Sequence, residues 1–197
     1  MELYNGLPLY IAKIDEETGL QVVSLVDYPA ISVDFLAFDK QKELVKLQVQ
    51  NEEQRICFGP ALIPDAPIYR RTPDGFEYFI TFPQDTIREC VEKFFKENRT
   101  NLTDVQHSFE IEPGVVMVQS MFKDTDNGIA PKGFEDCPDG TWFVAYHVEN
   151  DEVWDKVKSG EVRGFSIAGM FNLEPAEAQN LSKDIDELIT KIENKLK

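Results

Sequence analysis

The feature that most constrains the fold of this chain is a succession of short runs rich in β-branched and aromatic residues, separated by turn residues. The clearest of these runs are residues 7–14, 20–26, 55–63, 76–82, 115–122, 141–149 and 161–171. Strands therefore outnumber helices and do not alternate regularly with them. This order favours an α+β fold built on a mainly antiparallel sheet or small barrel, with helices packed outside it.

Two internal segments have helical patterns. Residues 83–99 gather their apolar side chains in one stripe, and Thr86 and Glu89 have the spacing of a capping box. The second helix is predicted between Asn150, which is a suitable N-cap, and Gly160, a residue type that commonly ends helices.

The chain is predicted to divide into one domain over residues 1–172 and a linker with a C-terminal amphipathic helix over residues 173–197. One face of that helix gathers Ile185, Leu188, Ile189, Ile192 and Leu196. Such a face can dock on a partner, join copies of the chain into a homo-oligomer, or pack on the chain's own domain. The pattern leaves these three alternatives open.

The composition is strongly acidic. Thirty-six Asp and Glu residues stand against 20 Lys and Arg, and the formal net charge is −16. This charge argues against binding to nucleic acid or to an anionic membrane, because both need clustered basic side chains. No apolar stretch approaches the length of a membrane span, and the N-terminus has no secretory signal pattern. We therefore expect a soluble protein.

Cysteine usage and loop motifs predict neither a metal nor a cofactor. Cys57, Cys90 and Cys137 are odd in number and form no CxxC pair, which indicates reduced thiols in a cytosolic setting. The stretch DTDNG has part of a calcium-loop pattern, but Gly128 stands where a ligand belongs. A phosphate-cradling glycine loop and an HExxH motif are both absent from the sequence.

Few residues are candidates for nucleophilic chemistry. The only histidines are His107, in a polar segment that leads into a strand, and His147, inside a strand. Ser166 lies in a strand where Phe165 and Ile167 point to the other face, and its small neighbours leave room for a substrate backbone. The stretch is not the GxSxG elbow of hydrolases. A lone serine in a strand usually has a packing role, and periodicity alone does not set Ser166 apart from that background.

Several segments together resemble one protein family. GPALIPDAPIYR at residues 59–70 is followed by FEYFITFPQDTI, by a histidine in NLTDVQHSFE, and by EVWDKVKSGEVRGFSIAG at residues 152–169. Their order is similar to that in the XkdF-like serine proteases of tailed phages and prophages. The resemblance covers roughly residues 7 to 172.

The resemblance implies a compact β-barrel flanked by helices, related to phage prohead proteases and more distantly to the capsid-maturation proteases of herpesviruses. It implies a serine endopeptidase that cleaves scaffold and major capsid protein segments inside the immature phage head, in the host cytoplasm. Carried onto this sequence, the nucleophile is Ser166 and the general base is His107. The base would take the serine proton as the hydroxyl attacks the scissile carbonyl. Backbone amides near Arg163, Gly164 and Phe165 are candidates for the oxyanion hole.

The third catalytic member is left open by the resemblance. The options are His147, Glu110, Asp104 and Glu149, and His147 is the leading one. Related sequences carry an acid in the strand after the histidine, where this chain has Gln119. A neutral amide can orient an imidazole but stabilises its charged form less than a carboxylate does.

A second hypothesis comes from a different class of protein. The acidic charge and the C-terminal amphipathic helix are also compatible with a non-catalytic capsid assembly or scaffold protein built on the protease fold. Reactivity of Ser166 toward a serine-directed probe separates this hypothesis from the enzyme.

Overall fold

The computed structural model describes residues 1–29, 48–51 and 54–176. The two α-helices are α1 (Gln84–Lys96) and α2 (Asp151–Ser159), and a short 3-10 helix, η2, covers Arg99–Asn101. The strands are β1 (Leu3–Tyr4), β2 (Leu7–Lys13), β3 (Gly19–Val26), β4 (Gln48–Asn51), β5 (Ile56–Leu62), β6 (Ile68–Arg71), β7 (Glu77–Thr81), β8 (Thr103–Val105), β9 (Val115–Phe122), β10 (Trp142–Val148), β11 (Gly164–Met170) and β12 (Asn172–Pro175).

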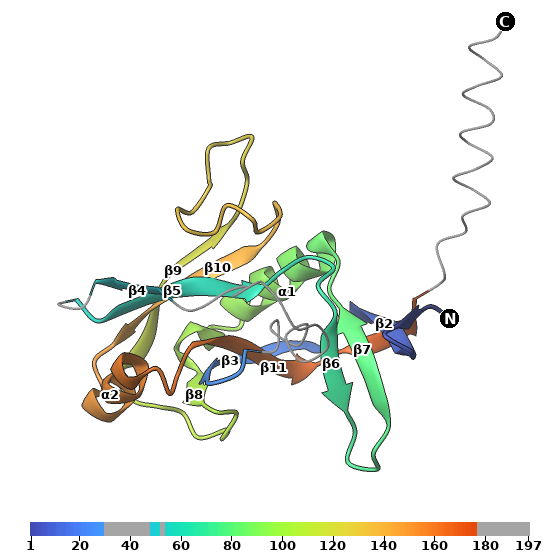
Figure 1. The fold of residues 1–197 in the computed structure, drawn as a ribbon, viewed down its shortest axis with the longest axis horizontal. Coiled ribbons are helices and arrows are strands. Elements are labelled where there is room, and N and C mark those ends of the chain that lie inside the picture. Colours follow the sequence, from blue (N-terminus) through green and yellow to red (C-terminus); the bar gives the residue numbers. More distant parts are fainter. Residues whose placement is uncertain (30–47, 52–53, 177–197) are drawn as a thin grey trace, which may run out of the picture.

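The strands form three sheets (Figure 1). The first has the order β1-β2-β7-β6, and β12 also pairs with β2. The second has the order β4-β5-β10-β9, and the third has the order β11-β3-β8. All ladders are antiparallel except β2 with β7 and β3 with β8, which are parallel. The mainly antiparallel α+β class is thus confirmed for the described part of the chain.

The closed barrel that the family resemblance implied does not form in residues 1–29, 48–51 and 54–176. Each sheet follows an open strand order, so the strands do not return on themselves to close a ring. One physical reason is that β11 of the third sheet lies close to β5 of the second, but no hydrogen-bonded ladder joins them. The chain also leaves the first sheet at the turn between β2 and β3. The Asp15 carboxylate accepts hydrogen bonds from the backbone N–H groups of Glu17 and Thr18, and the Lys93 ammonium donates to the carbonyls of Asp15, Glu16 and Thr18. The strands β2 and β3, which this turn connects, belong to different sheets.

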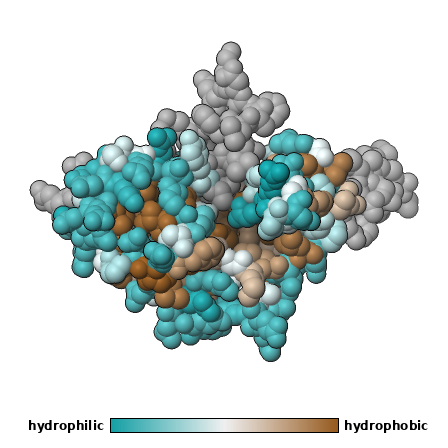
Figure 2. Space-filling view, turned by 90° about the horizontal axis from the view of Figure 1, so that it is seen from below, coloured by the Kyte–Doolittle hydropathy of each residue, from teal (hydrophilic) through white to brown (hydrophobic). Residues whose placement is uncertain are grey.

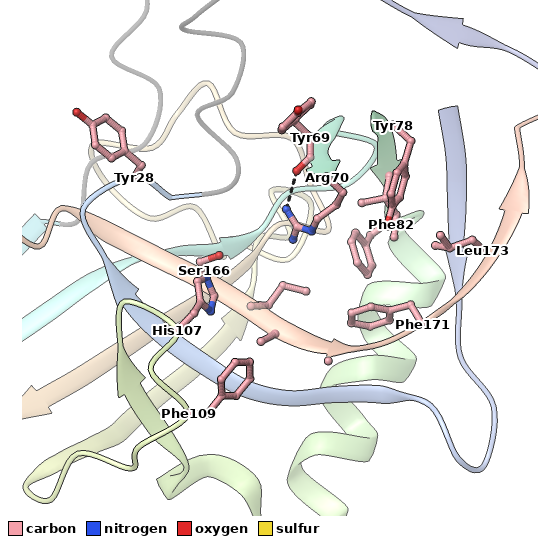
Figure 3. A pocket seen from close by; sticks show the side chains of 14 residues that line it. Tyr28, Tyr69, Arg70, Tyr78, Phe82, His107, Phe109, Ser166, Phe171 and Leu173 are labelled. Carbon is pink, nitrogen blue, oxygen red and sulfur yellow. Dashed lines mark hydrogen bonds between the residues drawn. The ribbon is translucent and has the colours of Figure 1, made fainter. Parts of the chain in front are cut away.

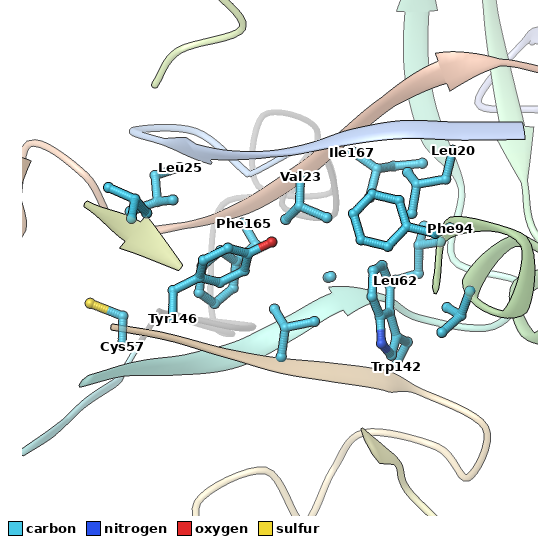
Figure 4. Close-up of a cluster of buried hydrophobic side chains, with 14 of the residues drawn as sticks. Leu20, Val23, Leu25, Cys57, Leu62, Phe94, Trp142, Tyr146, Phe165 and Ile167 are labelled. Atoms are coloured by element: carbon cyan, nitrogen blue, oxygen red, sulfur yellow. The ribbon is translucent and has the colours of Figure 1, made fainter. Parts of the chain in front are cut away.

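The main core lies between the β5-β10 sheet and the β11-β3 sheet, as Figure 4 shows. Tyr146 on β10 faces Phe165 on β11, with ring centroids 5.3 Å apart. At one end of this layer, Phe94 of α1 packs edge-on against Trp142, with centroids 6.1 Å apart. The apolar stripe of α1 therefore closes the open end of the two-sheet core.

Both predicted helices are confirmed, but one predicted cap is wrong. The helix α1 begins at Gln84 after Pro83, which makes no side-chain capping bond, and Thr86 is buried inside the first turn. The cap of α2 is confirmed, because the Asn150 Oδ1 atom accepts from the backbone N–H groups of residues 152 and 153. Gly160 ends that helix with φ of 74°.

Five strands lie outside the runs that the sequence predicted, namely β1, β4, β6, β8 and β12, and three of these bear on the site or on the domain boundary. The strand β6 lies between Pro67 and Pro73, in a segment that was not among the predicted runs, and β8 lies in the polar segment that contains His107. The strand β12 crosses the domain boundary expected after residue 172, because it pairs with β2. The predicted C-terminal amphipathic helix lies outside the described residues.

One face of the molecule has both hydrophobic and hydrophilic regions. Figure 2 shows hydrophobic residues gathered across the middle of one face, with hydrophilic residues on both sides of them.

Cys57, Cys90 and Cys137 are free and buried. In the described ranges, no helix has both the length and the apolar character needed to cross a bilayer.

The packing of α1 predicts that two neighbouring phenylalanines differ sharply in their contribution to stability. Phe94 is 0% exposed and Phe95 is 43% exposed. Phe94→Ala is expected to lower the free energy of unfolding by about 3–5 kcal/mol, because it leaves a cavity beside Trp142. Phe95→Ala is the matched control and should cost about 1 kcal/mol or less. Urea unfolding followed by tryptophan fluorescence measures both, and equal losses would contradict the assigned packing of α1.

Candidate active site

One pocket of about 640 Å³ opens beside β11 and brings together residues from distant parts of the sequence. Figure 3 shows its walls, which come mainly from β6, β7, β11 and the loop after β8. The lining residues are Tyr28, Tyr69, Arg70, Tyr78, Ile80, Phe82, His107, Phe109, Ser166, Ile167, Ala168, Gly169, Phe171 and Leu173. Ser166 and His107, the two residues predicted to carry the chemistry, both lie in this pocket.

Ser166 is held on β11 by the alternation that the sequence predicted. Phe165 and Ile167 are buried in the main core, so Ser166 points to the opposite face of the sheet, where it lines the pocket. The ladder with β3 is irregular between Ala168 and Gly169. Beyond this bulge, Phe171 packs edge-on against Phe82 and lines the pocket as well.

His107 is placed by a tight loop after β8. Gln106, His107 and Phe109 all have positive φ values, of 59°, 54° and 59°. Such values are uncommon for residues other than glycine and are sustained only where the surroundings enforce them. Here the buried Asp104 carboxylate accepts a hydrogen bond of 2.8 Å from the Phe109 backbone N–H, and the Gln106 N–H donates to the Leu25 carbonyl. These bonds turn the loop back over the sheet and aim the imidazole toward β11.

The direct partner of the imidazole is a second serine, Ser24. Its Oγ atom lies 2.9 Å from the His107 Nδ1 atom. Ser24 is also the cross-strand partner of Ser166 in the β3-β11 ladder, so the two hydroxyl-bearing residues lie on the same face of the sheet. Within the described part of the chain, His107 bonds to Ser24 and not to Ser166. Both serines are buried, with 2% of Ser166 and 0% of Ser24 exposed, but Ser166 lines the pocket and Ser24 does not.

The surroundings of His107 favour its neutral form. Burial lowers the pKa of the ring below its ordinary value of 6.5, the Asp104 carboxylate raises it, and the Arg70 guanidinium lowers it. The net direction is downward. An imidazole that is neutral near pH 7 can accept a proton, which is the property that a general base needs.

His147, the leading candidate for the third member, is not brought to this site. Tyr146 packs on Phe165 between the two sheets, so the next residue of β10 points away from β11. Ser166 points away from β10 for the same reason. His147 and Ser166 therefore lie on opposite outer faces of the two-sheet core. The His147 Nδ1 atom instead lies 3.5 Å from a Glu149 carboxylate oxygen at the surface.

Of the remaining options for the third member, only Asp104 lies beside His107. Glu110 is exposed, and Glu149 is beside His147. Gln119, which occupies the position where related sequences carry an acid, is exposed on β9 opposite Ala145 and does not line the pocket. The geometry therefore favours Asp104, on the strand before the histidine, over a residue on the strand after it.

The glycines around Ser166 have a packing role. A Cβ atom at Gly169 would lie 2.3 Å from the Gly19 carbonyl oxygen, and one at Gly164 would lie 2.7 Å from Pro29. Close approach of the protein's own chain therefore accounts for both glycines, in place of the approach of substrate that the sequence suggested. Among the amides considered for the oxyanion hole, the Arg163 N–H already donates to the Val26 carbonyl.

Sequence reasoning missed two residues of the site, Ser24 and Arg70. Ser24 is the single hydroxyl in an otherwise apolar part of β3, and a polar side chain in a buried run is a signal that it has a specific partner. Arg70 was missed because its segment, which lies between Pro67 and Pro73, was not among the runs predicted to form strands. An interpretation of IYRR as a strand would have placed Arg70 on the same face as the buried Ile68.

The environment of His107 predicts how its titration responds to one substitution. Asp104→Asn keeps an oxygen that can accept the Phe109 N–H bond but removes the charge that raises the pKa of His107. The pKa of His107 should therefore fall further below 6.5. A ring-proton NMR titration measures it, and Glu110→Gln is the control that removes an exposed carboxylate from the same loop. A pKa at or above 6.5 in the unmodified chain would contradict the assigned burial.

Comparisons with known proteins agree with the resemblance seen in the sequence. A family model described as "Putative phage serine protease XkdF" matches residues 44–174, a range that contains His107 and Ser166 but not Ser24. The Phage-like element PBSX protein XkdF of Bacillus subtilis (strain 168) is 30% identical over 169 residues, which are 80% of this chain and 56% of that protein.

A second relative from the same organism, the Uncharacterized protein YqbD, is 30% identical over 135 residues, which are 66% of this chain and 36% of that protein. The chain therefore spans less than two thirds of the length of either relative. No solved structure matches it.

Proposed function

The chain belongs to the phage serine protease XkdF family, and on that premise we propose that it is an active serine endopeptidase with Ser166 as nucleophile and His107 as general base. The observation that carries the proposal is the meeting of these two residues in one pocket, although Ser166 lies on β11 and His107 lies in the loop after β8, far apart in the sequence. A pocket lined by a serine hydroxyl and by an imidazole with a lowered pKa is typical of a nucleophilic site.

Ser24 takes the place of the orienting third member in this proposal. In serine hydrolases one imidazole nitrogen faces the nucleophile and the other donates to a group that orients the ring. The contact between Ser24 Oγ and His107 Nδ1 occupies one nitrogen and leaves Nε2 for Ser166. With Nδ1 protonated, the Nδ1–H group donates to Ser24, and Nε2 is the basic atom. Asp104 acts one step further away, since it holds the loop and stabilises positive charge on the ring.

The proposed reaction follows from this arrangement. The Ser166 Oγ atom attacks the scissile carbonyl carbon while its proton passes to His107 Nε2. The imidazolium then gives this proton to the leaving amine as the C–N bond breaks, which leaves an acyl group on Ser166. Water, deprotonated by the same nitrogen, hydrolyses the ester and restores the hydroxyl. Nε2 and Ser166 Oγ must come within hydrogen-bond distance in the substrate complex, a contact that often tightens only there.

The biological substrate in this proposal is the capsid system of a tailed phage or prophage. The support is family membership, together with a relative that is named as part of a phage-like element. We propose that the protease acts inside the immature head, in the host cytoplasm, on segments of the scaffold and the major capsid protein. Self-association of the chain belongs to the same proposal.

Two matched serine substitutions test the mechanism. Ser166→Ala is expected to abolish labelling by a fluorophosphonate probe and to lower peptide cleavage by at least about 10³-fold, because the nucleophile is lost. Ser24→Ala should retain labelling but lower the rate by about ten- to a hundredfold, since a hydrogen bond to a charged group contributes about 1.5–3 kcal/mol.

The pair of variants separates three outcomes. Labelling that survives in Ser166→Ala and disappears in Ser24→Ala would make Ser24 the nucleophile and overturn the assignment. No labelling of the unmodified chain, even within assembled heads, would favour the non-catalytic assembly protein. Circular dichroism of both variants checks that the fold persists.

The capsid role predicts a specific cleavage in cells. When the chain is produced together with the major capsid protein and scaffold of the phage that encodes it, one or both partners should lose a terminal segment. Mass spectrometry of the assembled particles identifies the new termini. The same termini in particles made with Ser166→Ala would rule out this chain as the protease responsible.

A further inference from the structure

We propose that the pocket selects a peptide substrate with an acidic side chain, which Arg70 binds close to the scissile bond. The inference rests on the proposed protease function and names the substrate class of the same site. It starts from the chemical character of the walls. Apart from Ser166 and His107, the described lining residues are mainly aromatic or aliphatic, and none of them is Asp or Glu. Among these lining residues, Arg70 is the one with a permanent positive charge.

The backbone fixes the direction of Arg70. On β6, residues two apart share a face, so Arg70 lies on the same face as Ile68, which is 1% exposed. Arg71 lies on the other face and is exposed. Figure 3 shows the Arg70 guanidinium within the pocket, between Tyr69 and Ser166. The Arg70 guanidinium lowers the pKa of His107, so its charge acts on the proposed general base.

The guanidinium has unused donors. Its Nη1 atom donates to the Tyr69 carbonyl oxygen over 2.9 Å. A guanidinium carries five N–H groups, and across the described ranges the hydrogen bonds and ion pairs provide Arg70 with no carboxylate partner. Burial lowers the pKa of Arg70, and the nearby Tyr78 hydroxyl raises it. A partly buried charge without a counter-ion is costly, and a ligand that supplies the missing carboxylate removes that cost.

The edge of β11 indicates how a peptide would reach Arg70. In the described residues β11 pairs with β3 on one edge and forms no ladder on the other, and β5 lies close to β11 but contributes no residue to the pocket lining. An extended peptide that adds along this edge would pass Ser166 with alternate side chains directed into the pocket. The aromatic wall of Tyr78, Phe82 and Phe171 would cover the methylene groups of such a side chain. A carboxylate at its tip would pair with the guanidinium, for which planar two-point contact is favourable.

The first test measures binding without catalysis. The full chain with Ser166→Ala is titrated with three probes: N-acetylglutamate amide, N-acetylglutamine amide, and N-acetylglutamine with a free terminal carboxylate. The glutamate probe is expected to bind at least about tenfold more tightly than the glutamine amide, as a charged hydrogen bond would produce. It should shift the NMR signal of the Arg70 Nε–H group and raise the pKa of His107, because the carboxylate offsets the charge of Arg70.

Two neighbouring substitutions provide the comparison. Arg70→Gln should bring the affinities of the glutamate and glutamine amides within about twofold of each other. Arg71→Gln is the matched control, since it removes the same charge from the adjacent exposed position, and it should keep the preference. Equal binding of the two amides to the Ser166→Ala chain, or equal effects of both arginine substitutions, would overturn the proposal. Preferred binding of the free terminal carboxylate would assign Arg70 to the end of a cleaved product and would also overturn it.

The second test uses the active chain on a library of peptides. Cleavage that depends on Ser166 should show Asp or Glu enriched at one position near the new termini. The ratio of kcat/KM for a glutamate peptide over its glutamine counterpart should be about ten- to a hundredfold and fall to about one in Arg70→Gln. Cleavage without acidic preference would overturn the role of Arg70. A binding preference without any Ser166-dependent cleavage would instead remove the protease function and leave the carboxylate site standing.

Discussion

The pairing of β11 with β3 is the interaction on which the rest of the site depends. It sets Ser166 directly opposite Ser24, and β8 joins the other edge of β3 in parallel. Because β8 leads into the loop that contains His107, the same three-stranded sheet positions both hydroxyls and the imidazole. A shift of this ladder by one residue would turn Ser166 into the core and Phe165 into the pocket. The buried packing of Phe165 against Tyr146 makes such a shift unfavourable.

The two-layer core also explains why two histidines of the same chain differ in role. Each sheet presents one face to the core and one face outward, and side chains alternate between them. His147 follows a core residue on β10, and Ser166 follows a core residue on β11. The thickness of the packed layers then separates these two side chains. His147 consequently forms a surface pair with Glu149, while His107 reaches the pocket from a loop.

The pocket and the His107 loop beside it concentrate polar groups that do not stabilise a fold by themselves. Asp104 has one carboxylate oxygen without a hydrogen-bond partner in the described residues, the His107 loop has three residues at positive φ, and Arg70 lacks a carboxylate partner in the same set. Each of these features costs free energy. The apolar core around Trp142 and Phe94 offsets this cost from a distance. Unfavourable features gathered on one wall, with a well-packed core behind them, are typical of a site that is retained for its chemistry.

The sequence by itself determined the strand-rich class, the position and faces of β11, the limits of α2 and the family. These properties depend on local periodicity, on capping residues and on motif order, all of which lie within short stretches of the chain. Only the tertiary structure decided which strands share a sheet, that β6 is a strand, and that Ser24 and Asp104 accompany His107 while His147 does not. The physical reason is that alternation predicts the face of a side chain but not the element that faces it. That choice depends on hydrogen-bonded pairing and core packing between segments as distant as Ser24 and Ser166.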